Sequence, residues 1–253
     1  MFIPKFVDWV YNYSKNKQAP GDTTCEFLRD KHYGKMKYKN VGYFFLILLA
    51  FVFIGFFKTY FGLFPHFDDL TTPLVHFHAA VLTLWVLLLI VQPLLIRYKK
   101  FAIHRLIGKF TYILVPLIIY SFIGMMNKQY NEEMLQKIPR SEIFEDLSLS
   151  VALLLLFITF YVLAIINKRK VSFHMRYMIA TGLVFFNPAI TRITLFWNIF
   201  NSHLFAFIFT DLILLVLIIF DIKNKRKYKA YVVVLTLFLV YHLEVILFYP
   251  RYK

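Results

Sequence analysis

Apolar runs of nearly membrane-spanning length recur along the whole chain and constrain its fold more than any other feature. As an α-helix, a run of roughly 20 residues crosses the hydrocarbon core of a bilayer. The chain is 60% hydrophobic over 253 residues, which is more apolar surface than a soluble domain of that length could bury. A transmembrane barrel is excluded because its strands would alternate apolar and polar residues. The sequence therefore predicts an all-α, polytopic integral membrane helix bundle.

Seven of these runs are expected to be transmembrane helices. They cover residues 41–57, 73–96, 104–126, 147–166, 174–196, 203–222 and 230–249. Thr72 is suited to cap the second helix and Pro73 to be its first residue. Pro188, after Asn187, removes a backbone hydrogen bond, which predicts a kink in the fifth helix or a break into a re-entrant segment. Residues 127–146 are expected to form an acidic loop.

The chain divides into a short N-terminal segment and one membrane domain. Residues 1–40 are polar and basic, with apolar residues at helical spacing, which indicates either an interfacial helix or a plain cytosolic tail. Residues 41–253 form the transmembrane domain. No cleavable signal peptide is visible, because the first long apolar run follows a charged segment. The only cysteine, Cys25, excludes an internal disulfide and a thiolate metal cluster.

The basic residues predict how the bundle is oriented. Segments 1–40, 97–109, 168–176 and 223–229 hold 8, 5, 4 and 5 of the 29 Lys and Arg residues. Basic loops face the cytoplasm, so the N-terminus is expected inside and the C-terminus outside, in the inner (cytoplasmic) membrane of a cell. The net charge of +15 then reflects membrane topology and lipid contact, and nucleic acid is not expected as a partner.

Two hairpins resemble each other within the chain. Ile96 is followed by basic residues and then His104, and Ile166 is followed in the same way by His174, with equal spacing. Each hairpin is expected to place its histidine at the start of its second helix, at the cytoplasmic end. His104 and His174 are therefore candidate cofactor ligands. Arg105 and Arg176, in the same helical turns, could hold an anionic headgroup, a haem propionate or a quinone carbonyl.

Several histidines are expected near the outer end of the bundle. His76 and His78 are two residues apart on one helix, so they point about 200° apart and serve different neighbours. If the first turn is frayed, they could join His66 and the Asp68-Asp69 pair in a metal site. Histidine and carboxylate ligands suit zinc, copper or iron, although the spacing matches no strict zinc motif.

Three ionisable residues deeper in the apolar runs are candidate transport residues. Asp211 and His242 are expected in the outer half of the membrane, where ionisable groups are costly and commonly functional. Arg192 lies near the outer end of the fifth helix, where it could snorkel to the interface or pair with Asp211.

Short motifs along the second to fifth helices resemble an uncharacterised family of predicted bacterial membrane proteins. The matching residues are His76 or His78, Gln92-Pro93-Leu94, His104-Arg105-Leu106-Ile107-Gly108, His174-Met175-Arg176-Tyr177-Met178 and Arg192. The chain is more distantly similar to di-haem transmembrane b-type cytochromes. That resemblance implies a haem between His104 and His174. Because the fourth helix has no histidine, an outer haem would need His76 or His78 paired with His242 or His203.

Four functions remain open from the sequence. The first is a membrane redox protein that binds haem b and exchanges electrons with a quinone or a redox partner. The second is a transporter of protons, ions or small anions that uses Asp211, His242 and Arg192. The third is a membrane-embedded metalloenzyme with an outer His/Asp site. The fourth is a structural or assembly subunit whose polar residues serve helix contacts.

Overall fold

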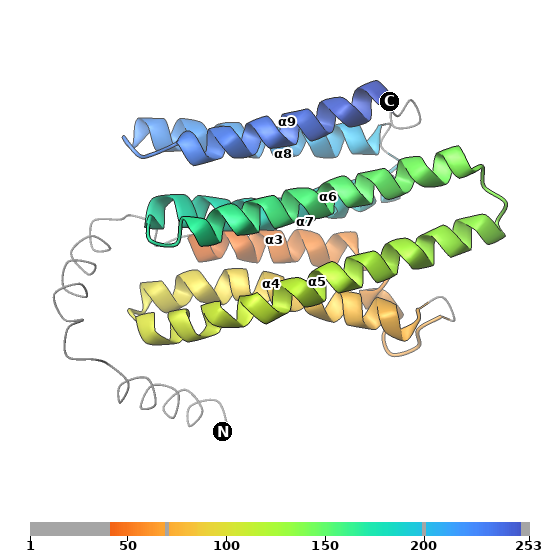
Figure 1. Cartoon of the computed structure of the whole chain (residues 1–253), viewed down its shortest axis with the longest axis horizontal. Helices are drawn as coiled ribbons and strands as arrows, with labels where there is room; N and C mark the ends of the chain where they lie inside the picture. Colours follow the sequence, from red (N-terminus) through yellow and green to blue (C-terminus); the bar gives the residue numbers. More distant parts are fainter. Residues whose placement is uncertain (1–40, 69–70, 199–200, 249–253) are drawn as a thin grey trace.

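The computed structural model describes residues 41–68, 71–198 and 201–248, and within them the chain is an all-α bundle (Figure 1). Its α-helices are α3 (Val41–Gly55), α4 (Pro73–Arg97), α5 (Phe101–Leu135), α6 (Arg140–Ile166), α7 (Val171–Phe196), α8 (Ser202–Lys223) and α9 (Lys229–Phe248), with a 3-10 turn η1 (Phe61–Leu63) between α3 and α4. The expectation for residues 1–40 lies outside the described residues.

Six of the helices, α4 to α9, are long and apolar enough to cross a membrane. The helix α3 has 15 residues, which is a length of about 22 Å at the α-helical rise. The predicted seven membrane helices are therefore six of full length and one, α3, that is short. It ends at Gly55 rather than at residue 57, in keeping with the low helix propensity of glycine. Large apolar side chains cover the exposed faces of the long helices. The protein is a multi-pass integral membrane protein.

The structure corrects the predicted loop at residues 127–146. α5 continues to Leu135 and α6 begins at Arg140, so only a short turn separates them. The polar extension of α5 is stabilised by pairs four residues apart: Lys128 with Glu132, and Gln129 Nε2 donating to Glu133 Oε1 at 2.8 Å. Such pairs stabilise a solvated helix, and hydropathy alone does not register them.

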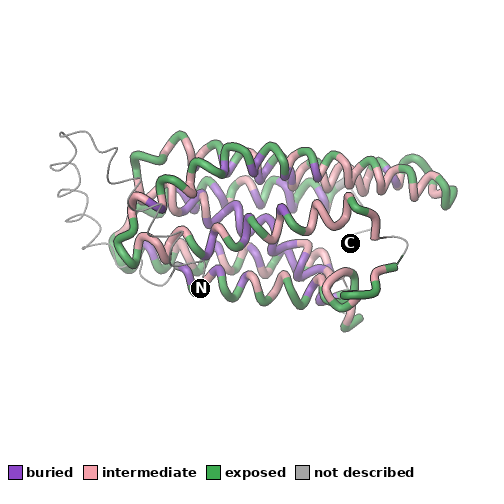
Figure 2. Tube along the Cα trace, turned by 90° about the horizontal axis from the view of Figure 1, so that it is seen from below, coloured by how far each residue is buried: buried purple, intermediate pink, exposed green. Residues whose placement is uncertain are grey.

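α7 is the central helix of the bundle. In its most apolar window 78% of the residues are buried, against 28–39% in the other five long helices. It packs against α3, α4, α6, α8 and α9. It is one continuous helix from Val171 to Phe196 with Pro188 inside it, so the re-entrant alternative is wrong. Figure 2 shows the buried residues along the middle of the bundle.

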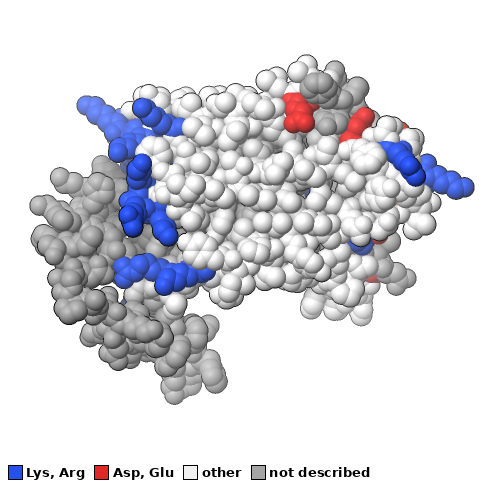
Figure 3. Space-filling model, viewed as in Figure 1, with Lys and Arg blue, Asp and Glu red and all other residues white. Residues whose placement is uncertain are grey.

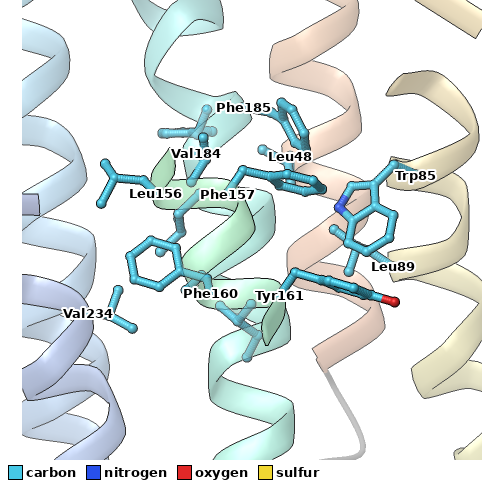
Figure 4. Packing of buried hydrophobic residues seen from close by; sticks show 14 of the residues in the cluster. Leu48, Trp85, Leu89, Leu156, Phe157, Phe160, Tyr161, Val184, Phe185 and Val234 are labelled. Carbon is cyan, nitrogen blue, oxygen red and sulfur yellow. The ribbon is translucent and has the colours of Figure 1, made fainter. Parts of the chain in front are cut away.

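The core is built from aromatic and branched side chains at the centre of the bundle. Trp85 on α4 is fully buried and meets Phe157 and Tyr161 of α6 edge-on, at centroid distances of 5.2 and 5.8 Å (Figure 4). Edge-to-face geometry is favoured by the ring quadrupoles. Phe160 of α6 packs in turn on Phe238 of α9. These contacts fix α4, α6 and α9 around α7.

All three basic turns lie at one end of the bundle. The α4–α5, α6–α7 and α8–α9 turns carry a band of Lys and Arg there, while the face seen in Figure 3 carries almost no charge across its middle. The charged and apolar zones match a protein that crosses a bilayer with its basic turns on one side.

Candidate functional site

The two hairpin histidines occupy equivalent positions, as the internal resemblance predicts. His104 is the fourth residue of α5 and His174 the fourth of α7, and lysines cap both helices, Lys100 and Lys170. Both histidines are partly buried at the basic end. They are close enough to interact electrostatically. Both imidazoles therefore lie at the basic end of the bundle, at the starts of α5 and α7.

Gln92 on α4 holds the His104 ring. With its side-chain oxygen facing the backbone N–H of Gly108 at 3.0 Å, the amide nitrogen donates to Nδ1 of His104. Nδ1 is then an acceptor, so a neutral His104 carries its proton on Nε2. The opposite amide orientation would place two N–H donors against each other at Gly108.

In His174 the hydrogen bond at Nδ1 has the opposite direction from that in His104. Its Nδ1 donates to the backbone carbonyl of Ala164 on α6 at 2.8 Å, which leaves the Nε2 lone pair free for a partner. An axial haem ligand has this arrangement, with Nδ1–H bonded to an acceptor and Nε2 toward iron. His174 fits that role, and His104 in its contact with Gln92 does not.

The basic end also contains a buried ion pair. Arg176 Nε donates to Asp221 Oδ2 on α8 at 2.7 Å, with the two side chains 0% and 3% exposed. The guanidinium also donates to the carbonyl of Ser172 at 2.6 Å and lies 5.3 Å from the Tyr231 ring centroid on α9. Arg176 thus joins α7, α8 and α9 and does not face an external anion, whereas Arg105 is exposed on α5.

The outer-end histidines point to different partners, as their spacing predicts. His76 Nδ1 lies 2.9 Å from the Tyr60 hydroxyl, whose pKa is raised by burial. His78 Nδ1 lies 3.0 Å from Ser121 Oγ on α5. Ser121 gives its own proton to Ile118, so His78 Nδ1 is the donor in that bond.

The predicted outer metal site is not assembled in the described part of the chain. His66 and Asp68 are exposed, and Asp69 lies outside the described residues. No group of three or more His, Cys, Asp or Glu side chains there could hold a metal ion. The outer haem pairing of His76 or His78 with His203 or His242 stays a prediction. α4, with His76 and His78, lies on the opposite side of the bundle from α8 and α9, with His203 and His242 (Figure 1).

Of the two alternatives predicted for Arg192, pairing with Asp211 is not formed. Its guanidinium donates to the Pro188 carbonyl at 3.2 Å and lies 4.3 Å from the Phe56 ring centroid of the turn after α3. Asp211 instead meets His242.

Asp211 and His242 form a dyad between α8 and α9. His242 Nδ1 lies 3.0 Å from Asp211 Oδ2, and the imidazole stacks on Phe207 at 4.2 Å between ring centroids. His242 is 3% exposed. Nδ1–H donates to the carboxylate, which fixes the ring and directs the Nε2 lone pair away from Asp211. Both Nε2 and Asp211 Oδ1 are buried without a hydrogen-bond partner in the described residues.

Sequence reasoning singled out Asp211 and His242 separately but missed their contact. It also missed Asp221, which sits beside the basic α8–α9 turn and looks there like an ordinary turn residue. The sequence did hold a signal for this ion pair. Asp221 is an isolated carboxylate at the end of one apolar helix, and Arg176 is at the start of another, at the same end of the bundle.

Comparisons with models of known protein families, with curated proteins and with solved structures gave no match.

Proposed function

We propose that this membrane protein transfers protons, and that the Asp211–His242 dyad is the group that carries them. The protein would lie in the inner membrane with its basic turns facing the cytoplasm, which puts the dyad in the outer half of the bilayer. One observation carries the proposal. A partly buried carboxylate and a buried imidazole are hydrogen-bonded between two membrane-length helices, and each keeps one buried polar atom without a partner in the described residues.

The chemistry of the dyad suits this role. Histidine exchanges protons near neutral pH, and a carboxylate partner stabilises its protonated form. With Nδ1–H held by Asp211, a proton enters and leaves at Nε2. Ionisable groups inside a bilayer are costly and typically belong to proton or ion pathways.

The other buried pair differs in the way expected of a structural contact. The Arg176 guanidinium contacts Asp221, Ser172 and Tyr231 at once, and neither Arg176 nor Asp221 has a buried side-chain polar atom without a partner. The dyad still has polar atoms that can accept hydrogen bonds, so it is the better candidate for proton transfer.

The test is proton flux into vesicles that contain the purified protein and a pH-sensitive dye, driven by a potassium diffusion potential. Wild type should acidify the lumen, and Asp211→Asn should abolish the protein-dependent flux, because the amide cannot stabilise a protonated imidazole. Thr210→Val is the matched control, since that hydroxyl is buried next to Asp211 but donates to the Ala206 carbonyl at 2.9 Å. Unchanged flux in Asp211→Asn would refute the proposal.

The second candidate is a b-type haem protein that passes electrons to a quinone or another redox partner. It is favoured by His174, whose Nδ1–H donates to a carbonyl and leaves Nε2 for iron, and by His104 at the equivalent position of α5 at the same end of the bundle. His104 could serve as the second ligand only if the Gln92 amide turned over. The absorption spectrum of protein purified from haem-supplied cells decides it: sharp α and β bands on dithionite reduction support it, and a colourless protein removes it.

A further inference from the structure

Four buried polar atoms on three neighbouring helices share one property. Asn187 Nδ2 and Thr191 Oγ1 on α7, Asp211 Oδ1 on α8 and His242 Nε2 on α9 have no hydrogen-bond partner among the described residues. Asn187, Thr191 and His242 are 3%, 6% and 3% exposed. Burying such a group without a partner is unfavourable, so the relative positions of these four atoms decide whether one ligand could satisfy them.

The geometry of the basic end shows which way Asn187 faces. Arg176 on α7 contacts Tyr231 on α9, with 5.3 Å from guanidinium to ring centroid. Both helices run from the basic end toward the outer end. Asn187 follows Arg176 by eleven residues, and His242 follows Tyr231 by eleven.

Eleven residues are about three full helical turns, or about 16 Å along the axis. Asn187 therefore returns to the face of α7 that carries Arg176, and His242 returns to the face of α9 that carries Tyr231. Asn187 and His242 are equally far along their helices from the Arg176–Tyr231 contact. They therefore lie at one level, on the facing sides of two packed helices. Asp211 joins that level through its bond to His242.

Two further features of α7 add polar groups beside Asn187. Thr191 lies one turn further along the same face, and its hydroxyl does not bond back to the helix as the Thr194 hydroxyl does. Pro188 has no N–H to donate to the carbonyl of Val184, four residues earlier. The face of α7 that looks toward the dyad therefore carries both hydrogen-bond donors and hydrogen-bond acceptors.

We propose that Asn187 and Thr191 complete, with Asp211 and His242, one buried site that binds water as the immediate proton carrier. The hydrogen-bonding groups match this ligand: Asn187 donates, Asp211 and His242 Nε2 accept, and Thr191 does either. Water can satisfy all four, and buried waters commonly make about three such bonds. The inference rests on the proposed proton transfer through the dyad.

The test combines flux with a direct probe of His242. Asn187→Leu and Thr191→Val remove the polar groups at nearly constant volume, and each should slow proton flux by at least about tenfold. Thr194→Val is the matched control on the same helix, because that buried hydroxyl donates to the carbonyls of Ile190 and Thr191 at 3.0 and 2.9 Å. It should leave the flux at the wild-type rate.

The second readout is the ¹⁵N NMR shift of His242 Nε2 in protein with labelled histidine, assigned by its loss in His242→Gln. In wild type and Thr194→Val the resonance should be displaced from the free lone-pair position toward the protonated position. In Asn187→Leu and Thr191→Val it should move back. A free lone-pair shift in wild type, or one shift in all variants, would overturn the inference.

The two proposals fail in different ways. If Asp211→Asn stops flux while Asn187→Leu and Thr191→Val transport at the wild-type rate, the dyad carries protons without this site and the further inference is wrong. If Asp211→Asn transports normally, the proposed function is wrong, and the NMR shift alone then decides whether the four residues share a bound water.

Discussion

Two carboxylates on α8 show how differently the same residue type can be used. Asp221 meets the Arg176 guanidinium, which is also bonded to Ser172. Asp211, ten residues earlier, meets only His242 and keeps a buried oxygen unpartnered in the described residues. The sequence predicted that Asp211 and His242 were exceptional, because each interrupts an apolar run. It could not predict their contact, because the two positions are 31 residues apart.

The Arg176–Asp221 pair should be a major source of stability. Asp221→Asn leaves a buried guanidinium without its carboxylate, which should lower the free energy of unfolding by about 3–5 kcal/mol. Glu132→Gln is the control, because the pair of Glu132 with Lys128 is partly solvated. This variant should lower the free energy of unfolding by less than about 1 kcal/mol. Both are measured by thermal or denaturant unfolding in detergent. Equal effects in the two variants would show that the buried pair is not special.

At the scale of helices, the apolar segments were predicted well and their polar continuations were not. α4 was predicted at both ends to within one residue, because Thr72-Pro73 marks its start and the basic turn its end. The polar residues of α5 and α6 beyond the apolar runs were misread as a loop, because side-chain pairs rather than hydropathy hold them helical. The central place of α7 follows from packing, which no single segment reveals.

The contact of α3 with α7 depends on a glycine. A Cβ on Gly55 would lie 2.5 Å from the carbonyl oxygen of Ala189, so Gly55→Ala forces two backbones apart. Overpacking of this kind should cost about 1–3 kcal/mol of unfolding free energy. Gly108→Ala is the matched control: its Cβ would be 3.8 Å from the nearest neighbouring atom, on the Gln92 side-chain amide, and alanine favours the helix by up to about 1 kcal/mol. A Gly55→Ala protein as stable as wild type would contradict the close contact.

At the scale of the whole molecule, the charges of the turns divide the bundle into two ends. The three turns with dense Lys and Arg share one end (Figure 3), as their spacing along the sequence predicts. This division was predictable because it depends on helix parity and charge alone. The arrangement of helices around α7 was not, because it depends on side-chain shape.

Cysteine labelling checks the orientation. In a Cys25→Ser background, Gln136→Cys lies in the α5–α6 turn and Lys227→Cys in the α8–α9 turn, and both positions are exposed. A membrane-impermeant thiol reagent added to intact cells should label position 136 and leave position 227 unmodified until the cells are opened. The reverse pattern would place the basic end outside.

The central claim is that the dyad carries protons, and its most direct measurement is the rate of proton uptake by vesicles holding wild type against vesicles holding His242→Gln. Glutamine retains a polar side chain but cannot exchange a proton near neutral pH. Because a positioned acid–base group typically accelerates proton transfer by about a hundredfold or more, the account predicts wild-type uptake well above the variant, with the variant near protein-free vesicles. Equal uptake by the two proteins would contradict it.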